Sequence, residues 1–284
     1  MIVITGATGA LNGTTTEHLL QRVPAADLVV VARDPSRAAH FAERGVTVRY
    51  GDYADPASLP AAFEGADQLL LVSSSDPAAD APALHRAAID AAVAARVGRV
   101  LYTSHQAAAV GAAFAPADHH ARTEQALAAS GLPWTALRNG FYAHSTAWLM
   151  GPWRATGVVS VPGDGPVSWT TRDDAAEAAA VLLTGAPVDG PVTITAPETR
   201  TFAELARDAS ELSGETVRYE LLGEDTWRDR AVAAGQDPRM VGFLLGMYRT
   251  AAAGGFAGTD PLLGRLLGRA PTGVRQVLAA QLAA

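Results

Sequence analysis

A glycine-rich stretch near the start of the chain has the residue types and spacing to bind phosphate. The chain begins MIVITGATGALNG, in which a short apolar run, Met1–Thr5, precedes Gly6, Gly9 and Gly13. A helical stretch follows from Thr14 toward Arg22, so the order is strand, glycine-rich turn, helix. Glycines let the backbone approach a pyrophosphate, and the unpaired N–H groups at a helix start attract an anion. The stretch predicts a dinucleotide cradle; the alternative is a glycine-rich turn that binds nothing.

A basic side chain follows the second expected strand. This strand, Leu28–Ala32, runs into Arg33-Asp34-Pro35-Ser36-Arg37. In dinucleotide-binding folds the residue at this strand tip meets the adenosine ribose, where an acid suits the 2′-hydroxyl of NAD and an arginine suits the 2′-phosphate of NADP. Arg33 therefore favours NADP, with Arg37 as a candidate second contact. The alternative is a solvated loop in which Asp34 caps a helix, and the two interpretations are compatible.

Small polar residues follow two further expected strands. Residues 46–50 run into Gly51-Asp52-Tyr53, where Asp52 is either an acceptor for an adenine amino group or an ordinary turn residue. Residues 67–72 run into Ser73, Ser74 and Ser75. Small side chains at the carboxyl end of a strand let a cofactor approach the backbone, although serine runs are also common in loops.

Strands and helices alternate through about residue 140. After the first strand we expect strands at 28–32, 46–50, 67–72, 99–103 and 134–137, and helices at 38–44, 56–63, 81–96 and 116–130. Alternation at these lengths predicts an α/β protein with a doubly wound parallel sheet.

The composition of the chain changes after this point. Residues 134–169 hold six of the 18 aromatic residues, which indicates either a pocket wall or the core between the sheet and a lobe. A Ser/Thr-x-x-Asp cap at Thr171 starts a helix that continues to Leu183. Later elements are expected as strands at 192–195 and 216–221 and helices at 202–212, 225–234, 238–250 and 274–282. We divide the chain into 1–140, which binds the dinucleotide, and 141–284, a smaller substrate-binding α/β lobe interleaved with it.

Composition excludes several classes of function. A net charge of −7 and the lack of a basic run argue against nucleic acid as a partner. The chain has no cysteine, and all 22 of its basic residues are arginine, so thiolate chemistry and lysine Schiff bases are excluded. We find no long apolar segment and no signal peptide, and therefore expect a cytoplasmic protein without a membrane partner.

These residues resemble the atypical short-chain dehydrogenase/reductases, specifically the NmrA-like group and, within it, the bacterial NAD(P)H:quinone oxidoreductases of type 2. The matching segments run in order from residue 1 to about 273: MIVITGATGAL, VVVARDPSRA, GVTVRYGDYADPASL, LLLVSSS, LYTS, HARTEQAL, ALRNGFY, TRDDAA and GRAPTGV. The resemblance implies a Rossmann-type domain with a small C-terminal substrate lobe. It also implies NADP(H) as cofactor and hydride transfer to quinones.

Site residues follow from the resemblance position by position. The pyrophosphate would be held by Gly6, Thr8, Gly9, Ala10 and Leu11, and the 2′-phosphate by Arg33. The nicotinamide side would be lined by Ser73, Ser74, Ser75, Thr103 and Ser104. The nicotinamide and substrate would be bordered by Asn139, Gly140, Phe141 and Tyr142, with Arg172 reaching in from the lobe.

The sequence departs from the family pattern at the cradle. The family's third glycine falls at position 12, which is Asn12 here, and glycine appears only at Gly13. A side chain on the first helical turn would crowd the strand or the pyrophosphate, unless the turn shifts by one residue. This departure puts tight cofactor binding in question.

A second departure concerns proton transfer. Conventional short-chain dehydrogenases use a Tyr-x-x-x-Lys pair, whereas the equivalent helix here carries His120-Ala-Arg-Thr-Glu124. A quinone is electrophilic enough to accept hydride without such an acid. An ordinary ketone would need a donor, for which the local candidates are Tyr142, His105, His119 and His120. Of these we assign Tyr142 and His105 as the catalytic candidates.

The segment Asp118-His119-His120 suggests a metal site at first sight. Adjacent histidines on a helix point about 100° apart and chelate poorly without partners, so a surface cluster at a helix start is expected and no metal is assigned.

The sequence thus predicts an NADPH-dependent oxidoreductase that transfers hydride to a quinone-like or other planar electrophilic small molecule. Two alternatives remain open: a non-enzymatic NADP-sensing protein, as NmrA itself suggests, and a non-redox cyclase or isomerase on the same fold. The resemblance further implies a homodimer.

Overall fold

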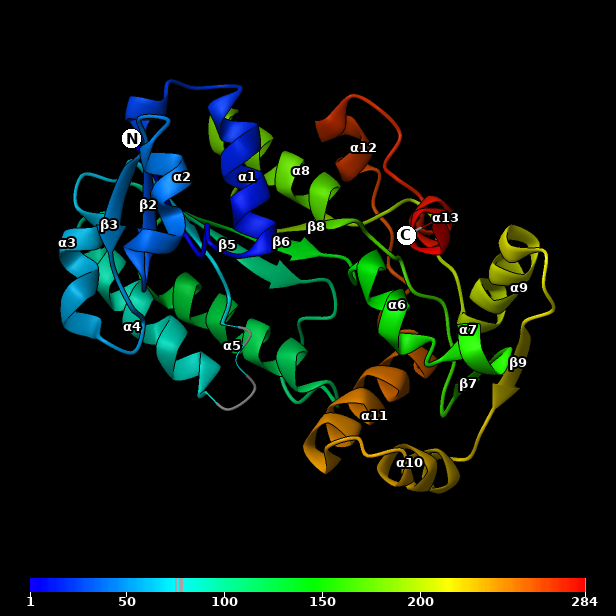
Figure 1. Cartoon of the computed structure of the whole chain (residues 1–284). Coiled ribbons are helices and arrows are strands. Elements are labelled where there is room, and N and C mark those ends of the chain that lie inside the picture. Colours follow the sequence, from blue (N-terminus) through cyan, green and yellow to red (C-terminus); the bar gives the residue numbers. More distant parts are fainter. Residues whose placement is uncertain (75, 77–78, 284) are drawn as a thin grey trace.

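The main sheet has seven parallel strands. The computed structural model describes residues 1–74, 76 and 79–283. The strand order is β3-β2-β1-β4-β5-β6-β8, and each neighbouring pair is parallel (Figure 1). The strands are β1 (Ile2–Thr5), β2 (Leu28–Ala32), β3 (Thr47–Tyr50), β4 (Gln68–Leu71), β5 (Arg99–His105), β6 (Trp134–Asn139) and β8 (Gly190–Ile194). This order confirms the predicted doubly wound Rossmann-type sheet.

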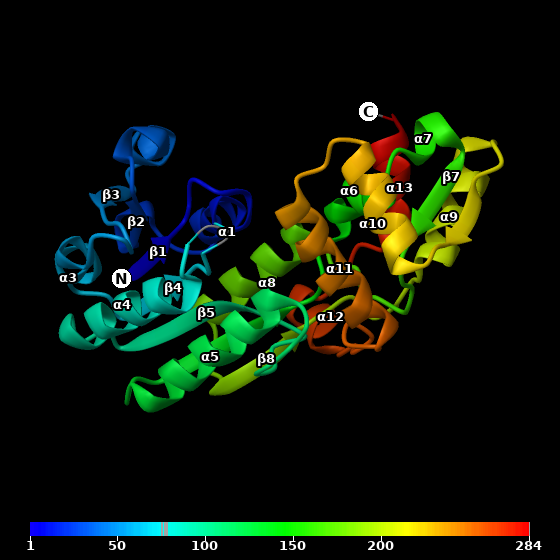
Figure 2. The ribbon, with the colours of Figure 1, turned by 90° about the horizontal axis from the view of Figure 1, so that it is seen from below.

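Helices cover both faces of this sheet because each strand alternates its side chains between two apolar layers. One layer is formed by α1 (Ala10–Leu20), α8 (Arg172–Thr184) and α12 (Leu262–Leu267), and the other by α3 (Leu59–Phe63), α4 (Ala81–Ala94) and α5 (Ala115–Ala129). Figure 2 views α4 and α5 from their own side. The sequence neighbours Val30 and Val31 illustrate the alternation, since each belongs to a different layer. Short helical segments lie in the connections before and after β2 and β3: η1 (Ala25–Asp27), η2 (Pro35–Ala38), α2 (Ala39–Ala42) and η3 (Pro56–Ser58).

The strand order reverses direction between β1 and β4. Successive strands proceed outward on one side as β1, β2, β3 and on the other as β4, β5, β6. In open α/β sheets a crevice forms outside the carboxyl ends of the strands at such a switch point, and ligands bind there. The fold therefore directs attention to the loops after Thr5 and Leu71.

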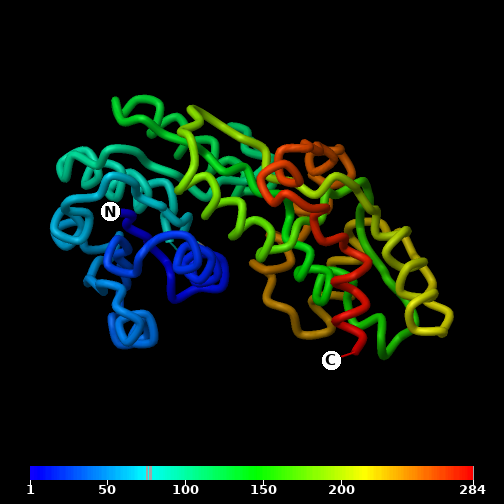
Figure 3. The backbone as a smooth tube through the Cα atoms, turned by 90° about the horizontal axis from the view of Figure 1, so that it is seen from above, coloured from blue at the N-terminus to red at the C-terminus, as the bar shows by residue number. Residues whose placement is uncertain are grey.

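The later part of the chain forms a lobe with its own core. A two-stranded parallel sheet, β7 (Val158–Val161) and β9 (Arg218–Leu221), packs with helices that lie beside the main sheet (Figure 3). These helical elements are η4 (Ala143–Ser145), α6 (Thr146–Leu149), α7 (Trp153–Thr156), α9 (Phe202–Ser213), α10 (Glu224–Ala233), α11 (Pro238–Ala252) and α13 (Val274–Ala283). Of the aromatic residues that suggested a pocket wall, Phe141, Trp153 and Trp169 are buried in this core, whereas Trp148 is exposed.

Sequence patterns placed some elements imperfectly. The first helix begins at Ala10 rather than Thr14, so position 12 lies within its first turn. The segments β7, α6, α7 and α12 were not expected from the sequence. Two elements from beyond residue 140 belong to the main sheet region: β8 pairs with β6, and α8 packs on the face of the sheet. The division of the chain at residue 140 stays a prediction. Within the described residues, no helix is long and apolar enough to cross a membrane.

Candidate functional site

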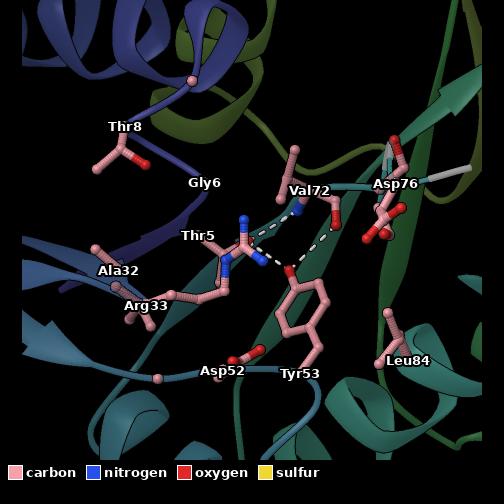
Figure 4. Close-up of a pocket in the computed structure, with 15 residues that line it drawn as sticks. Thr5, Gly6, Thr8, Ala32, Arg33, Asp52, Tyr53, Val72, Asp76 and Leu84 are labelled. Carbon is pink, nitrogen blue, oxygen red and sulfur yellow. Dashed lines mark hydrogen bonds between the residues drawn. The ribbon is translucent and has the colours of Figure 1, made fainter. Parts of the chain in front are cut away.

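A cavity of about 340 Å³ opens at the switch point. It lies against the carboxyl ends of β1, β2 and β4, and Figure 4 shows the side chains that surround it. Its lining residues are Thr5, Gly6, Thr8, Gly9, Val31, Ala32, Arg33, Gly51, Asp52, Tyr53, Val72, Ser73, Ser74, Asp76 and Leu84. Gly6, Thr8, Gly9, Arg33, Ser73 and Ser74, which were predicted from the sequence to contact the cofactor, therefore line one cavity.

The glycine-rich turn requires its glycines for space and conformation. Gly6 has a φ of +67°, and a Cβ atom there would lie 2.6 Å from a methyl group of Val72. Gly9 precedes α1 as its N-cap residue and supplies no side chain to the first N–H groups of that helix. Backbone N–H groups at the start of α1 can therefore donate to an anion, which the positive end of the helix dipole also favours.

The side chain of Asn12 is directed away from the cavity. It is 1% exposed, and its Nδ2 atom donates to the carbonyl oxygen of Thr5 at 2.8 Å. Gly13 provides the close approach between helix and turn, because a Cβ atom there would lie 2.8 Å from the carbonyl oxygen of Ala7. The expected crowding of the pyrophosphate by Asn12 is thus avoided, and Asn12 ties α1 to the end of β1.

We expect Asn12→Gly to weaken folding more than cofactor binding. Loss of a buried hydrogen bond and a glycine in a helix should lower the free energy of unfolding by about 1–2 kcal/mol. The Kd for NADPH should stay within about threefold, since the side chain faces β1. Urea unfolding and a fluorescence titration measure the two quantities. A Kd that improves by about tenfold or more would show that Asn12 obstructs the cradle.

Arg33 is an exposed cation at the edge of the cavity. Its side chain extends over the cavity from the end of β2 (Figure 4), and among the described residues it forms no hydrogen bond or ion pair. Asp34 is engaged by its own turn, where one carboxylate oxygen accepts from the N–H and hydroxyl of Ser36. These hydrogen bonds hold the pKa of Asp34 below its usual range. A cation without an acidic partner is suited to a phosphate.

A second hollow of about 380 Å³ adjoins the first at Thr8 and Gly9. Ala10 and Arg37 line it, so two further sequence candidates for phosphate contact lie here rather than in the main cavity. Leu11 instead packs against the apolar layer on the α1 side of the sheet. The assignment of Leu11 to the pyrophosphate stays a prediction that rests on its backbone alone.

Tyr53 braces the floor of the cavity, and its role was not predicted from the sequence. Its hydroxyl lies 2.7 Å from Oγ1 of Thr5 and 3.1 Å from the carbonyl oxygen of Val72. The Thr5 hydroxyl also accepts from the N–H of Val72 at 2.8 Å. The three residues fix the ends of β1 and β4 on either side of the switch point. An aromatic residue three positions after the end of β3 was the available signal.

The side chains predicted to line the nicotinamide side do not all point the same way. The N–H of Ser73 donates to Oγ1 of Thr103 at 2.8 Å, which joins the loop after β4 to β5 beside the cavity. Ser104 points to the other face of the sheet and donates to Glu124 at 2.6 Å, and Glu124 also pairs with Arg138. Ser75 lies outside the described residues. The roles assigned to these serines and to Thr103 stay predictions.

Asn139 and Tyr142 meet at the carboxyl end of β6. The Nδ2 atom of Asn139 donates to the Tyr142 hydroxyl at 3.2 Å, and burial raises the pKa of that phenol. Asn139 is 2% exposed, and its Oδ1 atom has no hydrogen-bond partner in the described part of the chain. A buried acceptor without a donor is costly unless a ligand supplies one. A carboxamide N–H would satisfy it.

The other candidates near Asn139 are Gly140, Phe141 and Arg172, none of which has a buried polar side-chain atom that lacks a partner within the described residues. At Gly140 a Cβ atom would lie 2.1 Å from Oγ1 of Thr170, so only glycine fits there. Phe141 belongs to the aromatic core of the lobe. Arg172 donates from Nε to Nδ1 of His144 at 2.9 Å, and burial together with this guanidinium lowers the pKa of His144 to about 4. None of these three lines the 340 Å³ cavity.

His105 ends β5 directly beside Asn139 in the strand register. Its Nδ1 atom accepts from the N–H of Ala107 at 3.1 Å, and its ring contacts those of Phe141 and Phe256 edge-on. Removal from water lowers the pKa of His105 to about 4. The imidazole is therefore neutral at pH 7 and carries its proton on Nε2.

These residues fit a nicotinamide dinucleotide. The start of α1 offers N–H groups to a pyrophosphate, Arg33 offers an uncompensated charge, and Asn139 offers a buried acceptor. Along the carboxyl edge of the sheet the three features lie at β2 (Arg33), β1 (the start of α1) and β6 (Asn139), in that order.

Comparisons with known proteins agree with this geometry. A family model described as NAD(P)H-binding matches residues 6–185. Quinone oxidoreductase 2 of Escherichia coli strain K12 is 36% identical over 274 residues, which cover 96% of this chain and 95% of that protein. The NmrA-like family domain-containing oxidoreductase flvB of Aspergillus flavus is 29% identical, across 97% of this chain and 94% of that protein.

Solved structures show the same overall arrangement. The NADPH-dependent quinone oxidoreductase QOR2 of Escherichia coli, complexed with NADPH, matches with a TM-score of 0.92 and 33% identity, over 99% of this chain and 100% of that one. The triphenylmethane reductase of Citrobacter sp., complexed with NADP(H), matches with a TM-score of 0.90 and 30% identity, over 99% of each chain. The chain therefore belongs to the NAD(P)H-binding family and, within it, to the NmrA-like oxidoreductases that include quinone oxidoreductase 2.

Proposed function

We propose that this protein is an NADPH-dependent oxidoreductase that transfers hydride to a quinone-like or other planar electrophilic molecule. The observation that carries the proposal is Arg33, a cation without a partner in the described residues, at the edge of a cavity built for a dinucleotide. Two relatives, one named for quinone reduction and the other for reduction of a triphenylmethane, support the class of acceptor.

The residues divide the work between binding and orientation. We assign the pyrophosphate to the turn Gly6–Gly9 and the 2′-phosphate to Arg33, while Asn139 orients the nicotinamide carboxamide. When bound, NADPH supplies the hydride. The protein contributes position and an environment poor in water, and the aromatic core around Phe141 and Phe256 borders the acceptor.

Proton delivery does not require the conventional pair. A Tyr-x-x-x-Lys pair is excluded because the chain has no lysine. A quinone that has accepted hydride becomes a hydroquinone anion, which takes its second proton from water. Tyr142 and His105 stay our catalytic candidates for hydrogen bonding to the acceptor, since both lie next to Asn139.

The proposal is tested by titrating the protein with NADPH and following energy transfer from tryptophan to the nicotinamide. A benzoquinone is then added while absorbance at 340 nm is recorded. We expect micromolar binding and a quinone-dependent loss of NADPH above the uncatalysed rate. Binding without turnover on any acceptor would favour an NADP sensor, and absence of binding would favour a non-redox enzyme.

The proposal includes a homodimer, as the family resemblance implies, and a location in the cytoplasm, as the sequence patterns led us to expect. Light scattering on the purified protein at micromolar concentration gives the mass of the particle. A mass equal to the 29.3 kDa of one chain would contradict the dimer.

A further inference from the structure

A chain of hydrogen bonds runs from the cavity wall across the sheet. The N–H of Ser74, a residue that lines the cavity, donates to Nε2 of His85 at 2.7 Å. Nδ1 of His85 lies 2.8 Å from the Thr123 hydroxyl. The hydroxyl of Tyr102, on β5, lies 3.4 Å from the same Nδ1 and 2.8 Å from Nδ1 of His120. Three elements, α4, β5 and α5, contribute to this chain.

The backbone donor at Ser74 fixes the proton of His85. An N–H group can only donate, so Nε2 of His85 accepts, and the neutral ring carries its proton on Nδ1. That proton goes to the Thr123 hydroxyl, which itself donates to the carbonyl oxygen of His119 at 2.8 Å. Since Nδ1 of His85 cannot accept, we assign Nδ1 of His120, at 2.8 Å, as the acceptor of the Tyr102 hydroxyl. His120 therefore carries its proton on Nε2.

His120 lies beside a second imidazole with the same tautomer. Its ring and that of His105 are stacked, with centroids 6.1 Å apart and planes 23° apart. The N–H of Ala107 fixes the proton of His105 on Nε2 in the same way. His120 is only half-buried, and no group of the described residues accepts from its Nε2 atom. Two Nε2–H donors thus stand next to each other at the end of β5.

We propose that His120 is a further catalytic residue, whose Nε2–H group donates a hydrogen bond to the acceptor oxygen that gains charge on hydride transfer. The inference rests on the proposed function. The acceptor receives a hydride, and therefore two electrons, from NADPH; its oxygen becomes an anion and later takes a proton from water. His120 keeps its own proton throughout. Tyr102 and His85 are positioning residues, which act by holding this tautomer.

A neutral imidazole can do this work because it donates without being charged. Burial is the main cause that keeps the pKa of His120 well below its usual range, and the neighbouring His105, His85 and His119 lower it further. The side chains of these neighbours and of Tyr102 are the titratable groups that face the ring. We therefore expect kcat to be flat between about pH 6.5 and 8 with respect to His120. A kcat that falls with rising pH in this range would require a protonated imidazole and would overturn the proposal.

Three variants test the donor by steady-state kinetics with duroquinone. His120→Leu removes the donor, and we expect kcat to fall by about 10- to 100-fold while the Kd for NADPH is unchanged. His120→Gln can place an amide N–H near the position of Nε2 and should stay within about threefold to fivefold of the wild type. The control Arg122→Ala changes an exposed residue of the same helix, which pairs with Asp118 and takes no part in the hydrogen-bond chain, and should leave kcat unchanged. Equal kcat values for wild type and His120→Leu, with folding confirmed by circular dichroism, would overturn the proposal.

A tautomer measurement separates this inference from the proposed function. In protein labelled with ¹⁵N-histidine, His120 should show the Nε2–H tautomer, and Tyr102→Phe should convert it to a mixture. Duroquinone added to protein saturated with NADP⁺, where no hydride is available, should shift the Nε2 resonance of His120. If the wild type does not consume NADPH, the proposed function fails, but this shift still supports the contact. An Nδ1–H tautomer, or no shift with duroquinone, would refute the role of His120.

Discussion

Arg33→Ala is expected to raise the Kd for NADPH by about 10- to 100-fold, because a charge-assisted hydrogen bond contributes about 1.5–3 kcal/mol. The guanidinium forms no hydrogen bond or ion pair with the described residues, so its interaction energy is available to a 2′-phosphate. NADH lacks this phosphate, and its Kd should change by less than about threefold. The preference for NADPH over NADH would then nearly disappear. Fluorescence titration with both cofactors measures the effect.

A matched control is Arg44→Ala. Arg44 is also an exposed arginine, but it is paired with Glu17 at 2.6 Å and does not line the cavity. It should leave both dissociation constants unchanged. Arg33→Lys should recover part of the affinity, since an ammonium keeps the charge but loses the planar, two-point contact. Equal losses for NADPH and NADH in Arg33→Ala would place Arg33 at the pyrophosphate or ribose and refute the assignment to the 2′-phosphate.

Local patterns in the sequence singled out residues of the proposed phosphate end that the fold brings to one cavity. Gly6, Gly9 and Arg33 lie within one residue to four residues of a strand end, and parallel strands bring their carboxyl ends to the same edge. The type of each residue and its distance from the strand were therefore enough. The position of Asn12 was harder to interpret. The direction of its side chain, toward the cofactor or toward β1, depends on the residue at which α1 begins. The N-cap residue is Gly9, which has no capping side chain, so the sequence does not show where the helix begins.

The acceptor side of the site could not be predicted in the same way. Thr103 and Ser104 are neighbours with similar chemistry, yet strand alternation directs Thr103 to the cavity loop and Ser104 to a hydrogen bond with Glu124 on the opposite face. The chain from Ser74 to His120 joins residues far apart in the sequence. No periodicity relates them, since their contacts depend on the packing of α4 and α5 against β5.

Two histidines beside the candidate site, His85 and His105, make the stability of the fold depend on pH. His85 is 1% exposed, and burial, with a smaller effect from His119, lowers its pKa to about 4; burial does the same for His105. Between about pH 6.5 and 4 the unfolded chain binds protons that the folded protein does not, so stability rises with pH across this window. The stability that these two neutral histidines preserve is fully present above about pH 6.5 and is lost as the pH falls toward 4.

We therefore expect these two histidines together to lower the free energy of unfolding by about 2–4 kcal/mol between pH 7.5 and pH 5, at about 1–2 kcal/mol each. His120 and His144, whose pKa values are also lowered, add to this loss. Urea unfolding at the two pH values measures this difference. His105→Leu should reduce this pH-dependent loss of unfolding free energy by about 1–2 kcal/mol, the contribution of one histidine. This holds whether or not the substitution also changes the stability at pH 7.5. The exposed His40, in His40→Gln, is the control and should leave the loss unchanged. A loss that His105→Leu does not reduce would mean that folding does not lower the pKa of this imidazole, which would contradict its withdrawal from water beside His120.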